Sequence, residues 1–143
     1  MATKGRPTVV IADDHAAVHP LLRRILEPDL DIVECVLDGE ALLDAVARLH
    51  PDLIVVDVVM PILNGVEAVL RLKAQSSTVA IVFISTDAGK ENVQRVLSTG
   101  ALAFVSKASA AEHLLPAAHA ALKGQPFLLD SPNPQAFRLA PGA

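Results

Sequence analysis

The chain has 143 residues, about the size of one ordinary domain, and its 52% hydrophobic content is ample for one buried core. It contains four Phe but no Trp or Tyr, which argues against an aromatic platform for stacking bases. The formal net charge of -4 excludes a basic footprint for a phosphate backbone, so we expect no direct nucleic-acid binding by this segment.

Five short β-rich runs recur along the chain, and a helical pattern follows each of them. The runs are residues 9–12, 32–36, 53–58, 80–85 and 103–106. The first helical pattern has apolar residues at the spacing of one buried helix face, with Pro20 in or near its first turn, where the missing N–H costs least. That predicted face consists of Val18, Leu21, Leu22, Ile25 and Leu26.

Two of the next three helices have clear stop signals. The second is predicted over residues 40–50, before Pro51, which disfavours continuation. The fourth ends at Gly100, the residue type best suited to a left-handed C-terminal cap. The predicted inward residues are Leu42, Val46 and Leu49 in the second helix, Val66, Val69 and Leu70 in the third, and Val93, Val96 and Leu97 in the fourth.

The fifth helix opens with Ser109 and Glu112 at the spacing of a capping box. Pro116 lies inside the helical pattern, so we expect a bend or a late start. The predicted apolar face is Ala111, Leu114, Leu115, Ala118 and Leu122. Prolines interrupt any periodicity beyond this helix. We therefore predict an N-terminal arm at residues 1–7, one domain at 8–125, and a tail or linker remnant at 126–143.

Neither a membrane span nor a secretion signal is predicted. Apolar runs such as residues 53–56 and 80–84 are far shorter than the roughly 20 residues that cross a bilayer. The run after the N-terminal arm breaks at Asp13 and Asp14, unlike the apolar region of a signal peptide. We therefore expect a cytoplasmic protein with no membrane contact. Cys35 is the only cysteine, which excludes an internal disulfide and a cysteine metal cluster.

The five histidines show no metal-ligand spacing with carboxylates, so we interpret them as surface residues. They are His15, His19, His50, His113 and His119.

Strands that alternate with helices predict an α/β fold, with a parallel sheet covered on both faces and apolar central strands. In such a sheet, ligands bind beyond the carboxyl ends of the strands. The chemistry-bearing residues at those ends are Asp13 and Asp14 after the first strand, Asp57 near the end of the third, Ser85 after the fourth and Lys107 after the fifth. We expect these side chains to converge on one edge.

Carboxylates crowded at one edge repel one another and resist ionisation unless a cation lies among them. Magnesium fits this need, because it prefers oxygen ligands in octahedral geometry and keeps several waters. We predict that Asp14 and Asp57 are direct ligands and that Asp13 binds through water. The backbone carbonyl of Val59 would complete the protein's contribution.

With the metal in place, Asp57 is predicted to act as the nucleophile on a phosphoryl group. The metal and Lys107 would stabilise the equatorial oxygens of that group. Ser85 would donate a hydrogen bond to the acyl phosphate once it forms.

The same residues carry a specific resemblance. The ordered set is IADD at residues 11–14, VVDVVMPILNG at 55–65, FIS at 83–85 and FVSK at 104–107. This set resembles the receiver domain of bacterial two-component response regulators over roughly residues 8–125. The resemblance implies a (βα)5 flavodoxin-like, doubly wound fold whose parallel five-stranded sheet has the order 2-1-3-4-5.

The resemblance also implies partners and a switch. The phosphoryl donor would be a sensor histidine kinase or a phosphotransfer protein. Phosphorylation would shift the face made by the fourth helix, the fifth strand and the fifth helix, and so control an unknown output partner. Ser85 and Phe104 hold the positions of the two residues that change rotamer together in the family. The resemblance also allows a phosphorylation-dependent homodimer. By this interpretation the chain is a signalling domain that catalyses only its own phosphorylation and dephosphorylation.

Three other functions compete with this one. A flavodoxin-like flavin binder would need a hydroxyl- and glycine-rich loop for a phosphate, whereas Asp13 and Asp14 would repel it. A magnesium-dependent phosphatase would also use a strand-end aspartate but needs a second acid and a substrate cap, and neither is visible. A degenerate receiver that serves only for docking is disfavoured by the intact acidic set and Lys107.

Overall fold

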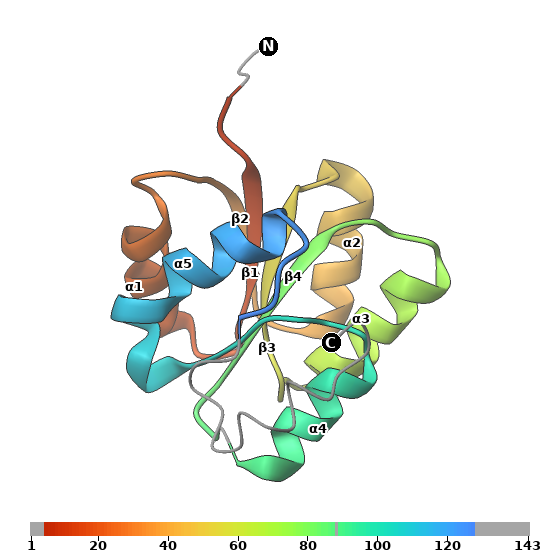
Figure 1. The fold of residues 1–143 in the computed structure, drawn as a ribbon. Helices are drawn as coiled ribbons and strands as arrows, with labels where there is room; N and C mark the ends of the chain where they lie inside the picture. Colours follow the sequence, from red (N-terminus) through yellow and green to blue (C-terminus); the bar gives the residue numbers. More distant parts are fainter. Residues whose placement is uncertain (1–4, 88, 128–143) are drawn as a thin grey trace.

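The computed structural model describes residues 5–87 and 89–127 and shows one parallel sheet between two layers of helices (Figure 1). The strands are β1 (Thr8–Ala12), β2 (Asp31–Val36), β3 (Leu53–Asp57), β4 (Ala80–Ser85) and β5 (Phe104–Ser106). Their spatial order is β2-β1-β3-β4-β5, as the resemblance implied. The order reverses at β1 and β3, which places the carboxyl ends of these two central strands at the switch point.

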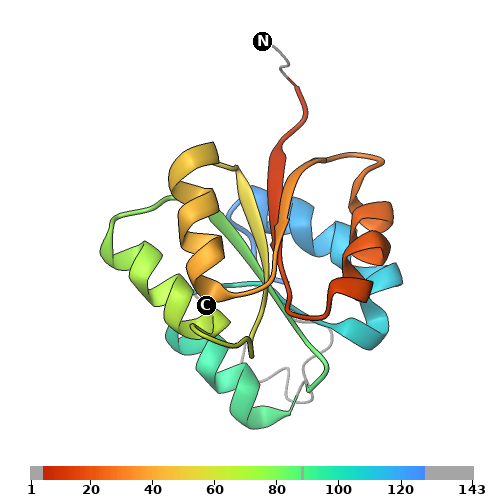
Figure 2. The same ribbon diagram turned by 180° about the vertical axis from the view of Figure 1, so that it is seen from behind.

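The helices are α1 (His19–Leu26), α2 (Gly39–Leu49), α3 (Gly65–Ala74), α4 (Lys90–Ser98) and α5 (Ala110–Leu122). Short 3-10 turns at Ala16–Val18 and Lys107–Ser109 precede α1 and α5. Figures 1 and 2 show α1 and α5 on one side of the sheet and α2, α3 and α4 on the other. No helix among residues 5–87 and 89–127 is long and apolar enough to cross a membrane.

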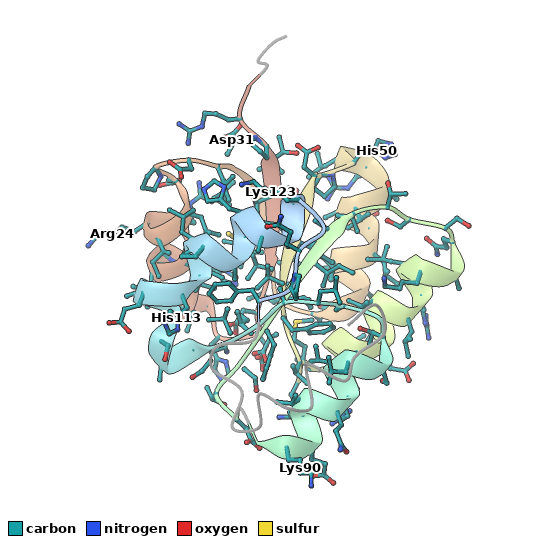
Figure 3. The ribbon with its side chains drawn as sticks, in the orientation of Figure 1. Arg24, Asp31, His50, Lys90, His113 and Lys123 are labelled. Atoms are coloured by element: carbon teal, nitrogen blue, oxygen red, sulfur yellow. The ribbon has the colours of Figure 1, made fainter. Side chains whose placement is uncertain are left out.

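The sheet contributes side chains to a hydrophobic core on each of its faces, because successive side chains of a strand point to opposite faces. In β1, Val9 and Ile11 pack with α1 and α5, whereas Val10 and Ala12 pack with the other three helices. Every residue of β3 is buried, which confirms the prediction that the central strands are apolar and covered on both faces. Charged side chains such as those of Arg24 and Lys90 point outward (Figure 3).

Four predicted inward residues are exposed instead. They are Leu21 (52%), Leu49 (37%), Leu70 (43%) and Ala111. For Leu21, Leu70 and Ala111 the cause is geometric: each residue turns about 100° around a helix axis, so the neighbour of a buried position already lies on the flank of the helix. Leu49 is the last residue of α2. In α1, Leu22 and Leu26 face the sheet, four residues apart, and Leu21 points away.

The start of α5 also differs from the prediction. Ser109 precedes the helix, but its side chain makes no cap hydrogen bond, so the capping box is wrong. The chain enters α5 from a 3-10 turn, and Ser109 therefore lacks the extended backbone that an N-cap needs. Ser106 caps this turn instead, with its hydroxyl oxygen accepting from the backbone N–H of Ala108 at 3.2 Å.

Pro116 lies inside α5, which begins at Ala110, so the late start is wrong and the predicted bend remains a prediction. The proline is exposed, so solvent reaches the backbone that its missing N–H leaves without a partner. Gly100 has a φ of 86°, which confirms its predicted left-handed conformation after α4.

Beyond α5 the chain returns to the edge of β5. The N–H of Phe127 donates to the carbonyl of Leu102 at 2.8 Å, and the N–H of Phe104 donates to the carbonyl of Phe127 at 3.0 Å. The domain boundaries at residues 7 and 125 remain predictions, because residues 1–4 and 128–143 lie outside the described part of the chain.

Candidate functional site

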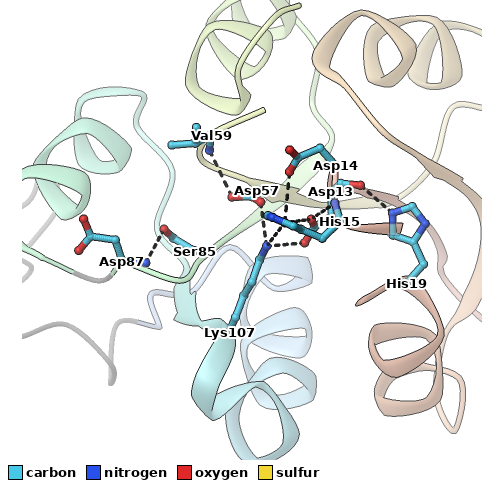
Figure 4. A network of polar contacts seen from close by, with 9 residues as sticks. All are labelled: Asp13, Asp14, His15, His19, Asp57, Val59, Ser85, Asp87 and Lys107. Atoms are coloured by element: carbon cyan, nitrogen blue, oxygen red, sulfur yellow. Dashed lines mark hydrogen bonds and ion pairs between the residues drawn. The ribbon is translucent and has the colours of Figure 1, made fainter. Parts of the chain in front are cut away.

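The predicted residues from four strand ends meet at one edge of the sheet (Figure 4). The ammonium nitrogen of Lys107 lies 2.8 Å from Oδ2 of Asp57 and 2.7 Å from Oδ2 of Asp13. Asp14 joins them, because its ligand atom and those of Asp13 and Asp57 lie within 4.8 Å of one another. Segments nearly one hundred residues apart therefore share one site.

Backbone contacts fix the first aspartate. Asp13 is fully buried, and its N–H donates to the carbonyl of Val36 on the neighbouring strand at 3.0 Å. Its Oδ1 accepts from the N–H of His15 at 2.8 Å, which turns the chain sharply after β1. The ring of His19 contacts the carbonyl of Asp13 at 2.8 Å. Asp13 is therefore held from three sides.

Asp57 is the last residue of β3, and a close approach of α3 helps to position it. Its Oδ1 accepts from the N–H of Val59 at 3.2 Å, and the residue is only 4% exposed. Gly65, at the start of α3, packs directly on the carbonyl of Asp57: a Cβ there would lie 1.9 Å from that oxygen. Only glycine allows this contact, which holds the loop after Asp57 against the strand.

The charges of the site do not cancel. Burial raises the pKa of Asp57, nearby Asp13 raises it further, and the ion pair with Lys107 opposes both. Burial lowers the pKa of Lys107, but its hydrogen bonds to Asp13 and Asp57 outweigh burial and leave that pKa raised. The three carboxylates of the site and the single ammonium of Lys107 together carry two net negative charges. A divalent cation matches that charge. The oxygen donors suit Mg²⁺.

Ser85 ends β4 and is 3% exposed. Its hydroxyl oxygen accepts from the N–H of Asp87 at 3.0 Å, and the hydroxyl hydrogen can still be donated. Phe104 is fully buried and belongs to the same apolar cluster as Val93 and Val96 of α4.

The sequence did not single out His15 for the site. Its Nδ1 lies 3.2 Å from Oδ1 of Asp13, 3.3 Å from Oδ1 of Asp14 and 3.4 Å from Nζ of Lys107. The ring is 61% exposed, so the prediction of a surface residue holds. One ring nitrogen lies within 4.8 Å of ligand atoms of Asp13, Asp14 and Asp57, so the expectation that no histidine has metal-ligand spacing with carboxylates is wrong. The feature of the sequence that could have placed His15 at the site is its position directly after Asp13 and Asp14.

Comparison with known proteins decides the family. The model of the response regulator receiver domain matches residues 9–119. The chain belongs to this family. Receiver domains act as phosphoacceptors in two-component signalling, typically bind Mg²⁺, and interact with histidine kinases and output domains. The fold and the family therefore agree with the predictions from the sequence.

Curated relatives share the receiver domain and extend beyond it. The chain is 30% identical to the nitrate/nitrite response regulator protein NarL of Escherichia coli K12, over 94% of this chain and 63% of the relative. It is 33% identical to the transcriptional regulatory protein DegU of Brevibacillus brevis, over 84% and 52%. A protein-glutamate methylesterase of Colwellia psychrerythraea is 36% identical over 69% of this chain and 27% of the relative. The chain thus spans less than two thirds of each relative's length.

Solved structures agree with this fold. The response regulator domain of CheB from Thermotoga maritima superposes with a TM-score of 0.76 at 28% identity, covering 85% of this chain and 99% of that receiver domain. The receiver domain of NarL from Mycobacterium tuberculosis gives 0.80 at 24% identity, covering 85% and 100%.

Proposed function

We propose that Asp57 is the phosphoacceptor of this receiver domain. The observation that carries the proposal is the position of its carboxylate, almost fully buried and 2.8 Å from the ammonium nitrogen of Lys107. The donor is a phosphohistidine on a sensor kinase or a phosphotransfer protein. A carboxylate oxygen of Asp57 forms the new P–O bond as the P–N bond breaks, and the electron pair of that bond stays with the leaving imidazole.

The surrounding side chains position and neutralise the transferred group. Lys107 already contacts Asp57, so its ammonium lies where a phosphoryl oxygen needs a positive partner. Ser85 donates its hydroxyl hydrogen to the acyl phosphate. Ser85 ends β4, the strand next to β3, and Lys107 follows β5, one strand further, so both residues lie at the same edge of the sheet as Asp57.

Mg²⁺ fits the oxygen donors at this edge. We infer that Asp14 and Asp57 bind it directly, that Asp13 binds it through water, and that the carbonyl of Val59 completes the set. When bound, Mg²⁺ supplies positive charge that neutralises the phosphoryl oxygens. The net charge of the site and its crowded carboxylates support this assignment.

Magnesium should therefore stabilise the fold. At a Mg²⁺ concentration about 100 times its dissociation constant, the free energy of unfolding rises by about 2.7 kcal/mol. The thermal midpoint then rises by roughly 10 °C. Calorimetric scans with Mg²⁺ and with a chelator measure the shift. Asp14→Asn should remove most of it, whereas Asp44→Asn, on the exposed side of α2, should keep it.

The Mg²⁺-induced rise in thermal midpoint should depend on pH with a defined sign. The pKa of Asp57 in the folded metal-free protein is raised, so lowering the pH through that pKa stabilises this state and protonates a ligand. The Mg²⁺-induced rise in thermal midpoint therefore shrinks as the pH falls. A rise that grows with acidity would contradict the assignment of Asp57.

The register of β4 and β5 supports a switch at the face made by α4, β5 and α5. Ser85 pairs with Ser106, and Phe83 pairs with Phe104, whose ring packs with residues of α4. We infer that a hydrogen bond from Ser85 to the acyl phosphate is coupled to Phe104 and so to the face of α4, β5 and α5. This face would control the output partner, directly or through a phosphorylation-dependent homodimer.

We place the protein in the cytoplasm, where sensor kinases phosphorylate their receivers.

Acetyl phosphate distinguishes this function from a phosphatase activity. With Mg²⁺, the chain should gain one acid-labile phosphoryl group and catalyse only its own phosphorylation and dephosphorylation. Phosphate release and intact mass are measured together. Many rapid turnovers without a phosphorylated chain would indicate a phosphatase, and neither labelling nor release would indicate a domain that only docks.

A further inference from the structure

His15 brings a nitrogen donor to an edge of the sheet that otherwise offers carboxylate oxygens. Asp13, Asp14, His15 and Asp57 each have one ligand atom within 4.8 Å of those of the other three. Among residues 5–87 and 89–127, no other group of three or more histidine, cysteine, aspartate or glutamate side chains is arranged to hold a metal ion. Mg²⁺ prefers oxygen ligands, so the proposed Mg²⁺ site does not use this imidazole.

The backbone of His15 is held on both sides, although its ring is 61% exposed. Its N–H donates to Oδ1 of Asp13 at 2.8 Å, and its carbonyl accepts from the N–H of Val18 at 2.8 Å. The ring turns towards the carboxylates, with Nδ1 3.2 Å from Oδ1 of Asp13 and 3.3 Å from Oδ1 of Asp14 (Figure 4). The nitrogen that faces the acidic group is therefore Nδ1.

The separation between Nδ1 of His15 and Oδ1 of Asp14 fits a tetrahedral ion. Zn²⁺ binds nitrogen and oxygen at about 2.0 Å, and two ligand atoms of such a tetrahedron lie about 3.3 Å apart. Octahedral Mg²⁺, with bonds of about 2.1 Å, brings neighbouring ligand atoms to about 3.0 Å. The observed 3.3 Å matches the tetrahedral spacing. An ion of this class therefore binds between the two side chains with little movement of the ring.

We propose that Nδ1 of His15 and the carboxylates of Asp14 and Asp57 bind a nitrogen-preferring transition-metal ion of the zinc class, which competes with Mg²⁺. The proposal rests on the proposed role of Asp14 and Asp57 as metal ligands. Imidazole suits Zn²⁺, whereas carboxylate and water suit Mg²⁺. Three protein ligands leave the fourth position of a zinc tetrahedron to water. His15 thus sets which divalent ions the site takes.

The affinity of the untagged chain for Zn²⁺ tests this role of His15. Isothermal titration calorimetry with zinc chloride compares the wild-type chain with His15→Ala, which removes the imidazole and keeps the backbone N–H that Asp13 accepts. We expect the Kd for Zn²⁺ to rise at least about tenfold, because even the loss of a residue that only orients a ligand costs that much. The Kd for Mg²⁺ should change by less than about threefold, because Mg²⁺ is bound by oxygen.

His119→Ala is the matched control. Nε2 of His119 lies 2.7 Å from Oδ2 of Asp29, so this histidine also faces a carboxylate. Within the described part of the chain, no third such side chain joins that pair to form a metal-binding group. His119 lies in α5, where alanine is a good helix former. This variant should keep the Kd for Zn²⁺ of the wild-type chain.

Nitrogen NMR of the wild-type chain identifies the ligand atom directly. One equivalent of Zn²⁺ should shift the ¹⁵N resonance of Nδ1 of His15 more than that of Nε2, and it should leave the ring of His119 unshifted. Addition of Mg²⁺ should reverse the shift. If His15→Ala fails to fold, this measurement decides the role of His15 alone.

Several results would overturn the proposal. An unchanged Zn²⁺ affinity in His15→Ala, or an unshifted Nδ1 resonance, would leave the ring as a hydrogen-bond partner of Asp13 only. Equal losses in His15→Ala and His119→Ala, or bound Zn²⁺ that a binding concentration of Mg²⁺ does not displace, would place the ion elsewhere. Failure of Mg²⁺ to bind the wild-type chain would instead contradict the proposed magnesium site, so the two proposals fail in distinguishable ways.

Discussion

Replacing Asp57 by Asn should lower the rate of labelling by acetyl phosphate at least about a thousandfold. The amide is a poor nucleophile, and it also weakens the metal site. Radiolabel or intact-mass kinetics with Mg²⁺ measure the loss. Asp44→Asn is the matched control, since Asp44 is an exposed aspartate paired with Arg48 on α2. Persistent labelling of Asp57→Asn would place the phosphoryl group on another residue.

The same variant should be more stable than the wild-type chain in the absence of metal. Burial and the charge of Asp13 raise the pKa of Asp57, so its ionised carboxylate costs stability at neutral pH. An amide of similar shape removes that cost. A raised thermal midpoint together with lost labelling separates a chemical defect from unfolding.

Lys107→Met should produce the largest loss of stability at the site. The ammonium contacts Asp13 and Asp57, whose side chains are 0% and 6% exposed, and methionine leaves both carboxylates without a buried positive partner. Removing one partner of a buried ion pair costs about 3 kcal/mol or more. Urea unfolding with a chelator present measures this loss. Lys123→Met, at an exposed lysine after α5, is the control.

Acid and metal should each restore part of the stability of Lys107→Met. Without the ammonium, the folded-state pKa of Asp57 lies even higher, so protonation stabilises the fold as the pH falls through that pKa. Mg²⁺ neutralises the same carboxylates. The rate of labelling should still fall about a hundredfold, because the metal does not replace a hydrogen-bond donor to the phosphoryl oxygens. Full activity in Lys107→Met would refute its proposed role.

The strand positions followed from patterns that are local in the sequence. Apolar runs such as residues 53–56 can only be central strands of a covered sheet, and the side chains that follow them must meet at one edge. For this reason Asp13, Asp57 and Lys107 could be brought together before any coordinates were known. The resemblance supplied the strand order and the switch residues.

What the sequence did not predict depends on contacts between distant segments. Leu21 looked like a core residue because periodicity does not set how wide a stripe the sheet covers. The chain reaches α5 through a 3-10 turn, which removed the cap expected at Ser109. Ile62 has a φ of 69° in a loop against which Gly39 and Gly65 pack, at the carbonyls of Leu63 and Asp57, and no local pattern of residues predicts that conformation.

The most direct test of the account is to locate the phosphoryl group on the wild-type chain. The chain is incubated with acetyl phosphate and Mg²⁺, the acyl phosphate is trapped by reduction, and the modified peptide is sequenced by mass spectrometry. We expect one modification per chain, at Asp57, that disappears when a chelator replaces Mg²⁺. Modification at any other residue, or labelling of Asp57 that does not depend on the metal, would contradict it.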